Sequence, residues 1–228
     1  MDQGGEERTA AELIGAASKA LQAGLVRDSD RTAPGPHEIR EFGPALRDTL
    51  TAVLNEHSGS SGEVQLGYRA SIVDWNRPTT QVDLAVAADA VPELVAELKV
   101  WDVGHQLFDV AKVCCLLKAG ARAGFLLCIA RSADAFDREP GGELFRDKAG
   151  LEHGDVFPVI FQRHPEEARK HLKANRPRPT LLPRRFSTTA VCDPVELDAY
   201  PGHQLRVVEV RIEDSTPTEI PPELIADE

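Results

Sequence analysis

The chain has 228 residues, of which 42% are hydrophobic and 28% are charged, and its formal net charge is −11. This length and composition are typical of one soluble globular domain with its own core. Because no run of about 18 apolar residues is present, the sequence predicts no membrane-spanning helix. The acidic N-terminal residues also predict no signal peptide.

The cysteines favour an intracellular protein. There are four of them, and none forms a C-x-x-C pair. Cys114, Cys115 and Cys128 lie in apolar segments, and Cys192 stands apart. This spacing suits reduced thiols better than a disulfide framework or a zinc site. We therefore expect a cytoplasmic location.

The N-terminal part, residues 1–35, is predicted to form a helix followed by a loop. Apolar residues recur at helical spacing over residues 10–25, and a segment rich in Asp, Ser, Gly and Pro follows. A second helix is predicted over residues 37–56, but Gly43-Pro44 cannot sit unstrained in its interior. Either this helix is kinked, or Pro44 occupies the first turn of a shorter helix.

Three strands are predicted next. Residues 63–73 alternate between apolar and polar side chains, which indicates a first core strand. Residues 81–89 and 94–101 are both apolar, and a short link containing Pro92 joins them. Two such neighbouring strands most simply form an antiparallel hairpin.

Charged side chains interrupt this hairpin at Asp83, Glu97 and Lys99. If Asp89 opposes Glu93, Asp83 falls opposite Lys99 and the three charges project from one face. Two adjacent carboxylates repel each other unless a cation lies between them, and Mg²⁺ prefers oxygen ligands. A lysine beside the ion can orient a water for phosphodiester hydrolysis. A solvent-exposed stripe of charges is the alternative interpretation.

A helix over residues 103–118 and a buried strand over residues 124–130 are predicted to follow, connected as a parallel crossover. His105, Asp109 and Lys112 share one face of this helix at spacings of four and three. A solvated polar face is the simplest interpretation. His105 with Asp109 could instead form a metal-binding pair.

The order of these features resembles the PD-(D/E)xK, or restriction-endonuclease-like, nuclease superfamily. The features are Asp83, then Glu97-Leu98-Lys99 after a turn, then a helix and a buried strand. The resemblance covers residues 81–130. Val82 stands where the superfamily motif has proline.

The resemblance implies an α/β fold with a restriction-endonuclease-like core, in which helices flank a mixed central β-sheet. It assigns residues 36–212 to this domain and leaves residues 213–228 as an acidic tail. It implies Mg²⁺, with Mn²⁺ as a substitute, held by Asp83, Glu97 and the main-chain carbonyl of Leu98.

The same resemblance implies further site residues. Lys99 would position the attacking water or stabilise the leaving charge. The helix before the first strand often supplies a glutamate, for which Glu38 is a better candidate than Glu41. The helix after the hairpin often supplies a polar residue, for which Gln106 and Lys112 are the candidates.

The expected partner is nucleic acid, most simply DNA, contacted through the basic segment Arg163–Arg185. The net charge of −11 argues against this partner, although acidic residues are concentrated in the tail. The alternative is a catalytically inactive restriction-endonuclease-like protein that acts as a protein-interaction or regulatory module. The arginines could equally pair with the acidic tail.

The C-terminal half carries weaker patterns. Residues 132–154 are predicted to be mostly loop with a short helix at 143–148, and residues 175–186 to be irregular because of their prolines. Strands are predicted at 156–161 and 205–212, and a short helix at 165–174.

Overall fold

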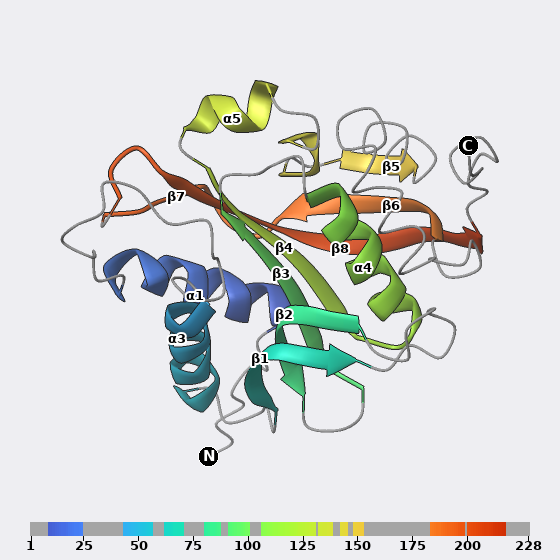
Figure 1. Ribbon diagram of the computed structural model, residues 1–228, viewed down its shortest axis with the longest axis horizontal. Coiled ribbons are helices and arrows are strands. Elements are labelled where there is room, and N and C mark those ends of the chain that lie inside the picture. Colours follow the sequence, from blue (N-terminus) through green and yellow to red (C-terminus); the bar gives the residue numbers. More distant parts are fainter. Residues whose placement is uncertain are drawn as a thin grey trace, which may run out of the picture.

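The computed structural model (Figure 1) describes residues 9–24, 43–56, 62–70, 80–87, 91–100, 106–130, 132–138, 142–145, 148–152, 183–198 and 200–217. These residues form one mixed sheet of eight strands with helices on both of its faces. The expected α/β class with a mixed central sheet is therefore confirmed.

The strands follow the order β1-β2-β3-β4-β8-β6-β5 across the sheet, and β7 pairs with β8. They are β1 (Glu63–Ala70), β2 (Thr80–Ala87), β3 (Leu94–Val100), β4 (Ala123–Ala130), β5 (Lys148–Glu152), β6 (Pro183–Ala190), β7 (Val195–Glu196) and β8 (Gln204–Pro217). Among the described strands, β3 and β4 are parallel neighbours and the other pairs are antiparallel. The helix α4 (Gln106–Lys118) connects β3 to β4, so the expected parallel crossover is confirmed.

Two helices begin with local signals that the sequence already carries. The main-chain N–H of Thr9 donates to Glu12 Oε2 at 2.7 Å, and the N–H of Glu12 donates to Thr9 Oγ1 at 3.3 Å. This reciprocal capping box starts α1 (Ala10–Gly24). Pro44 lies in the first turn of α3 (Gly43–Glu56), where its missing N–H costs nothing. This position agrees with the second alternative for Pro44, and residues 37–42 lie outside the described residues.

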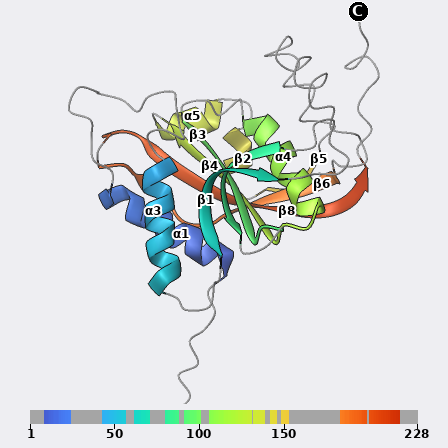
Figure 2. The same ribbon diagram turned by 60° about the horizontal axis from the view of Figure 1, so that its bottom comes forward.

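The helices α1 and α3 lie beside each other on one face of the sheet (Figure 2). Ile14, Leu46 and Leu50 are fully or almost fully buried and pack into a cluster with Leu127 and Ile129 of β4. Each such buried side chain contributes about 1.5–3 kcal/mol through removal of apolar surface from water. This face of the sheet is held by hydrophobic packing.

The helix α4 packs on the opposite face. Val110, Val113 and Cys114 are fully buried in a second cluster that includes Leu126 of β4. A side chain at Gly124 would place its Cβ only 2.5 Å from Val113 Cγ1. Gly124 therefore allows α4 to approach β4 closely.

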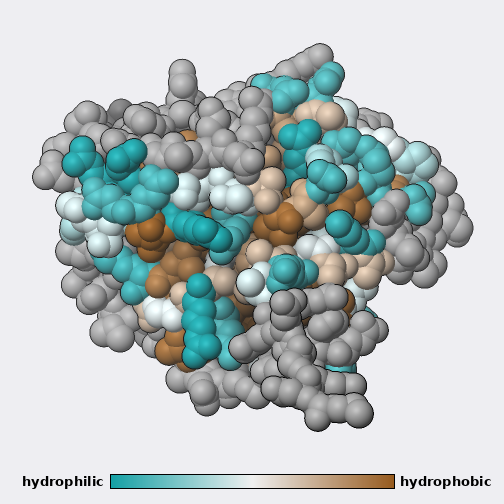
Figure 3. All heavy atoms as spheres, turned by 180° about the vertical axis from the view of Figure 1, so that it is seen from behind, coloured by the Kyte–Doolittle hydropathy of each residue, from teal (hydrophilic) through white to brown (hydrophobic). Residues whose placement is uncertain are grey.

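The described part of the surface seen from behind carries several hydrophobic areas (Figure 3). Hydrophobic areas on this view are interrupted by hydrophilic side chains (Figure 3). Among the described residues, Val91 is the large hydrophobic side chain classed as exposed, at 48%. No helix in the described segments has the length and apolar character needed to cross a membrane.

The C-terminal half differs from its predicted elements. Residues 183–186 were expected to be irregular, but they form the first part of β6. Pro183 is tolerated there because it lies at the first position of the strand, where its missing N–H costs little. The strand β8 continues through Pro217, so residues 213–217 of the expected acidic tail belong to the sheet. The antiparallel pairing of β6 with β8, which runs from Pro183 opposite Pro217 to Ala190 opposite Val208, accounts for both extensions.

The segment predicted to be mostly loop contains regular structure. It forms the helix α5 (Ala133–Arg138), a 3₁₀ turn (Gly142–Phe145) and β5. Phe136 and Phe145 contact each other edge to face, which fixes the turn against α5. The predicted strand at 156–161 and helix at 165–174 lie outside the described residues.

Candidate metal site at the β2–β3 hairpin

The hairpin forms as expected, but its register differs from the predicted one. Leu84 pairs with Ala96, and Val86 pairs with Leu94. Continuing this register by one residue places Asp83 across from Glu97, so the predicted pairing of Asp83 with Lys99 is wrong. Toward the turn, the main-chain N–H of Glu93 donates to the Val86 carbonyl at 2.8 Å, and Pro92 before it has no N–H to donate.

The change in register leaves the faces of the side chains unaltered, because a shift of two residues preserves the alternation of a strand. Val95 of β3 packs in the cluster beneath α4, whereas Leu98 packs in the cluster beneath α1 and α3. Glu97 and Lys99 alternate with Leu98 and therefore share the α4 face with Val95. Alternation does not assign Asp83 in the same way, because Val82 and Ala85 both pack in the cluster beneath α4.

Asp83 lies where the two strands separate. Regular pairing between β2 and β3 stops at Leu84 and Ala96, although both described strands continue. Beyond that point, the main-chain N–H of Leu98 donates to Asp83 Oδ2 at 2.9 Å. The carboxylate thus takes the place of a strand carbonyl as the acceptor. The Asp83 side chain is only partly buried there.

Glu97 is fully buried, with 1% of its side chain exposed. Its Oε1 lies 2.8 Å from Lys112 Nζ, and its buried Oε2 has no hydrogen-bond partner among the described residues. Burial raises the pKa of the Glu97 carboxyl well above its usual range. Lys112 opposes this rise, and the negative charges of Asp83 and Asp109 add to it.

Asp109 connects the two lysines. Its Oδ2 lies 3.6 Å from Lys99 Nζ, and its Oδ1 lies 3.6 Å from Lys112 Nζ. Burial lowers the pKa of Lys112, but the charges of Glu97 and Asp109 together outweigh burial and raise that pKa above its usual range. The result is a network of alternating charge, from Glu97 through Lys112 and Asp109 to Lys99.

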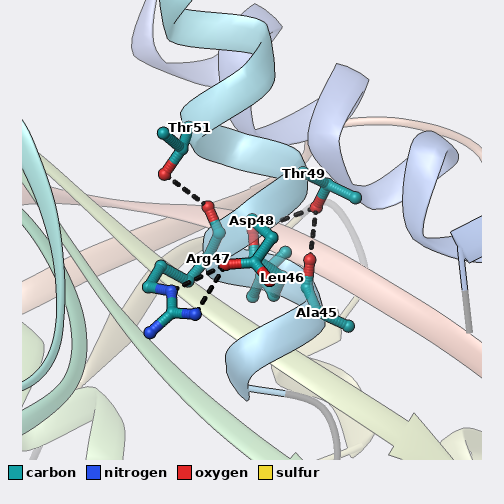
Figure 4. Close-up of polar contacts among 6 residues, drawn as sticks. All are labelled: Ala45, Leu46, Arg47, Asp48, Thr49 and Thr51. Atoms are coloured by element: carbon teal, nitrogen blue, oxygen red, sulfur yellow. Dashed lines mark hydrogen bonds and ion pairs between the residues drawn. The ribbon is translucent and has the colours of Figure 1, made fainter.

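The polar side chains of α3 show how different this network is. Arg47 and Asp48 form an ion pair at 2.7 Å, but their side chains are 43% and 66% exposed (Figure 4). Thr49 and Thr51 donate to carbonyls of the preceding turn of the same helix (Figure 4). An exposed pair between sequence neighbours contributes little to stability, whereas the α4 network joins a helix to a strand in a buried setting.

The structure brings together Asp83, Glu97 and Lys99 of the expected site residues. Leu98 lies between the last two, and its main chain contacts Asp83. Gln106 is the first residue of α4, and Glu38 lies outside the described residues.

The helix adds two residues that the simplest interpretation placed on a solvated face. Asp109 is only 4% exposed, and the Lys112 side chain is 24% exposed. That interpretation is therefore wrong for Asp109. The signal for both residues was their spacing of three on a helix next to an E-x-K strand, which permits a Lys112–Glu97 and an Asp109–Lys99 pair.

The oxygen atoms of Asp83 and Glu97 are of the kind that a divalent cation prefers. The buried Oε2 of Glu97 has no hydrogen-bond partner among the described residues, and Asp83 is close enough to raise the pKa of Glu97. No group of three or more His, Cys, Asp or Glu residues in the described segments is arranged to hold a metal. Mg²⁺ is commonly bound through one or two carboxylates and several waters, so a two-carboxylate site is sufficient.

Comparisons with protein-family models, curated proteins and solved structures find no match to this chain.

Proposed function

We propose that this protein is a Mg²⁺-dependent nuclease that hydrolyses phosphodiester bonds in DNA. The observation that carries the proposal is that the Asp83 carboxylate, at the end of the β2–β3 pairing, accepts a hydrogen bond from the main-chain N–H of Leu98, which lies between Glu97 and Lys99. Two carboxylates and an ammonium in this arrangement suit metal-assisted phosphodiester hydrolysis.

The order of elements supports the same proposal. The chain runs through α3, the antiparallel strands β1, β2 and β3, then α4 and the parallel strand β4. This arrangement agrees with the core implied by a restriction-endonuclease-like fold. The resemblance in the motif and the arrangement of the strands thus point in one direction.

Each residue has a chemical role in this proposal. Asp83, Glu97 Oε2 and the carbonyl of Leu98 would hold the ion. When bound, Mg²⁺ supplies a lowered pKa for water and stabilises charge on the phosphate. Lys99, whose side chain is 25% exposed, would orient the water as its oxygen bonds to phosphorus. The ester P–O bond breaks, which leaves a phosphate monoester and a hydroxyl group.

DNA contact is proposed through the segment Arg163–Arg185, of which only the end belongs to the described residues. Arg184 and Arg185 are exposed on β6. Arg185 lies 4.0 Å from Glu213, so part of its charge is already offset by the end of β8.

Cleavage assays test the proposal directly. Single-stranded, double-stranded and branched DNA are incubated with wild-type protein and Mg²⁺ or Mn²⁺, beside Asp83→Ala and Lys99→Ala. We expect each substitution to reduce cleavage by at least about 100-fold. Asp48→Ala, which removes an exposed acid of α3, serves as the matched control and retains wild-type cleavage. Cleavage that survives both site substitutions would refute the assignment.

A second candidate function is a catalytically inactive member of the same fold that binds a protein partner. The complete burial of Glu97 and its pairing with Lys112 favour this candidate, because the carboxylate already has a cationic partner. Calorimetric titration with Mg²⁺ and Mn²⁺ separates the two functions, with Glu97→Ala as the control. Binding that depends on Glu97 supports the nuclease, and no binding supports the inactive protein.

A further inference from the structure

The pairing between β3 and α4 has a regular pattern. On β3, Glu97 and Lys99 are two residues apart and share a face, and on α4, Asp109 and Lys112 are three residues apart. The strand acid contacts the helix lysine, and the helix acid contacts the strand lysine. Every charge of the quartet therefore has an opposite charge on the other element.

This pattern gives the two carboxylate oxygens of Glu97 different surroundings. Lys112 Nζ lies 2.8 Å from Oε1, which leaves the buried Oε2 without a hydrogen-bond partner among the described residues. A buried carboxylate oxygen without a partner is costly. A ligand that satisfies it must be cationic or a hydrogen-bond donor. The ammonium of Lys112 also restricts rotation of the Glu97 carboxylate, because rotation would break the ion pair.

Asp109 extends the same control to Lys99. Both of its oxygens lie 3.6 Å from a lysine nitrogen, one on each side. Asp109 is almost fully buried, so its charge is screened little by solvent. It therefore holds Lys112 toward Glu97 and Lys99 toward the helix at the same time.

We propose that Asp109 and Lys112 are positioning residues, which orient Glu97 so that Oε2 receives the divalent cation and which hold Lys99 beside it. This inference rests on the proposed function. Groups that hold metal ligands through a hydrogen bond or ion pair are worth about 10- to 100-fold in metal affinity. Neither Asp109 nor Lys112 contacts the reacting atoms in this assignment.

The test is Mn²⁺ binding measured by calorimetry, without nucleic acid. Lys112→Met is expected to weaken Mn²⁺ binding by about 10- to 100-fold, and Asp109→Asn is expected to weaken it less. Lys112→Arg keeps the positive charge and recovers a larger share of the affinity than methionine does. Lys19→Met removes an exposed lysine of another helix and leaves the affinity unchanged. Circular dichroism verifies that each variant is folded. If Lys112→Met does not fold, Asp109→Asn and Lys112→Arg still test the proposal.

The outcomes separate this inference from the function on which it rests. If wild-type protein binds no Mn²⁺, the proposed function and the inference both fail. If Asp83→Ala abolishes binding while Lys112→Met and Asp109→Asn bind as wild type, only the inference fails. A gain in affinity in Lys112→Met would also overturn it, because Lys112 would then compete with the cation for Glu97.

Discussion

The face of the sheet beneath α1 and α3 and the face beneath α4 are built on the same two central strands with different chemistry. Toward α1 and α3, the strands present only apolar side chains, which are Leu94, Ala96, Leu98, Val100, Phe125, Leu127 and Ile129. Toward α4, β3 presents Val95 and then the charged pair Glu97 and Lys99. Both faces are buried, so hydrophobicity alone does not explain the second.

The difference shows which interface of the fold is less stable than apolar packing would make it. Desolvation of buried charges can exceed the Coulomb attraction between them, and well-packed apolar residues of similar volume are often as stable or more stable. The α1–α3 face shows that this chain builds an apolar interface where one suffices. The buried charges beneath α4 therefore mark the part of the molecule where function is most simply sought.

The largest expected effect on stability comes from breaking the charged network on one side only. Lys112→Met leaves Glu97 buried without its cation and should lower the free energy of unfolding of the metal-free protein by about 3–5 kcal/mol. Combining it with Glu97→Met should return the stability close to the wild-type value or above it. Urea denaturation measures both. Additive losses in the double variant would show that the two side chains do not interact.

A somewhat smaller effect is expected from a cavity on the apolar face. Leu50 is fully buried between α3 and the sheet, and Leu50→Ala should lower the free energy of unfolding by about 3 kcal/mol. Leu50→Ala disturbs no charge. We therefore expect no second apolar substitution to restore its stability in the way that Glu97→Met restores that of Lys112→Met. Mn²⁺ affinity should remain at the wild-type value, and a large loss of affinity would contradict the separation of the two faces.

The smallest expected effect concerns the thiols. Cys114 and Cys115 lie on α4 and are buried in the cluster between this helix and the sheet. Burial raises the pKa of both thiols above their usual range. Burial also raises the pKa of the Cys192 thiol, but this residue is only partly buried, at the edge of the apolar cluster, and is therefore the more accessible. Iodoacetamide should therefore label Cys192 at least about tenfold faster than the two helix cysteines in the native protein, as followed by peptide mass spectrometry. Equal rates would show that α4 opens readily from the sheet.

Much of the fold was predictable because local patterns coincide with tertiary burial. The alternation of β1, the apolar runs of β2 and β3 and the continuous apolar strand β4 each appear at their predicted places. The prediction was poorest at β5, β6 and the end of β8. These strands are stabilised by pairing with distant segments, as in the contact of Pro183 with Pro217, and prolines and acids conceal them in the sequence.

The candidate site divides along the same line. The shared face of Glu97 and Lys99 could be predicted from the period of a strand alone, since that period is a local property of the backbone. The position of Asp83 could not, because Val82 and Ala85 both pack beneath α4 and the period does not hold there. The register of the hairpin could not, because it depends on where the chain turns near Pro92. The roles of Asp109 and Lys112 were left among alternatives, since a helical period identifies a shared face but not what that face contacts.

The sequence by itself determined the elements of the core and the set of charges they carry, because periodicity and side-chain chemistry act over a few residues. Only the tertiary structure decided which charges meet. The closeness of α4 to β3 and β4, permitted at Gly124 by the missing side chain, brings Lys112 to Glu97 and Asp109 to Lys99. Such contacts depend on the rotation and distance of packed elements, which no local pattern encodes.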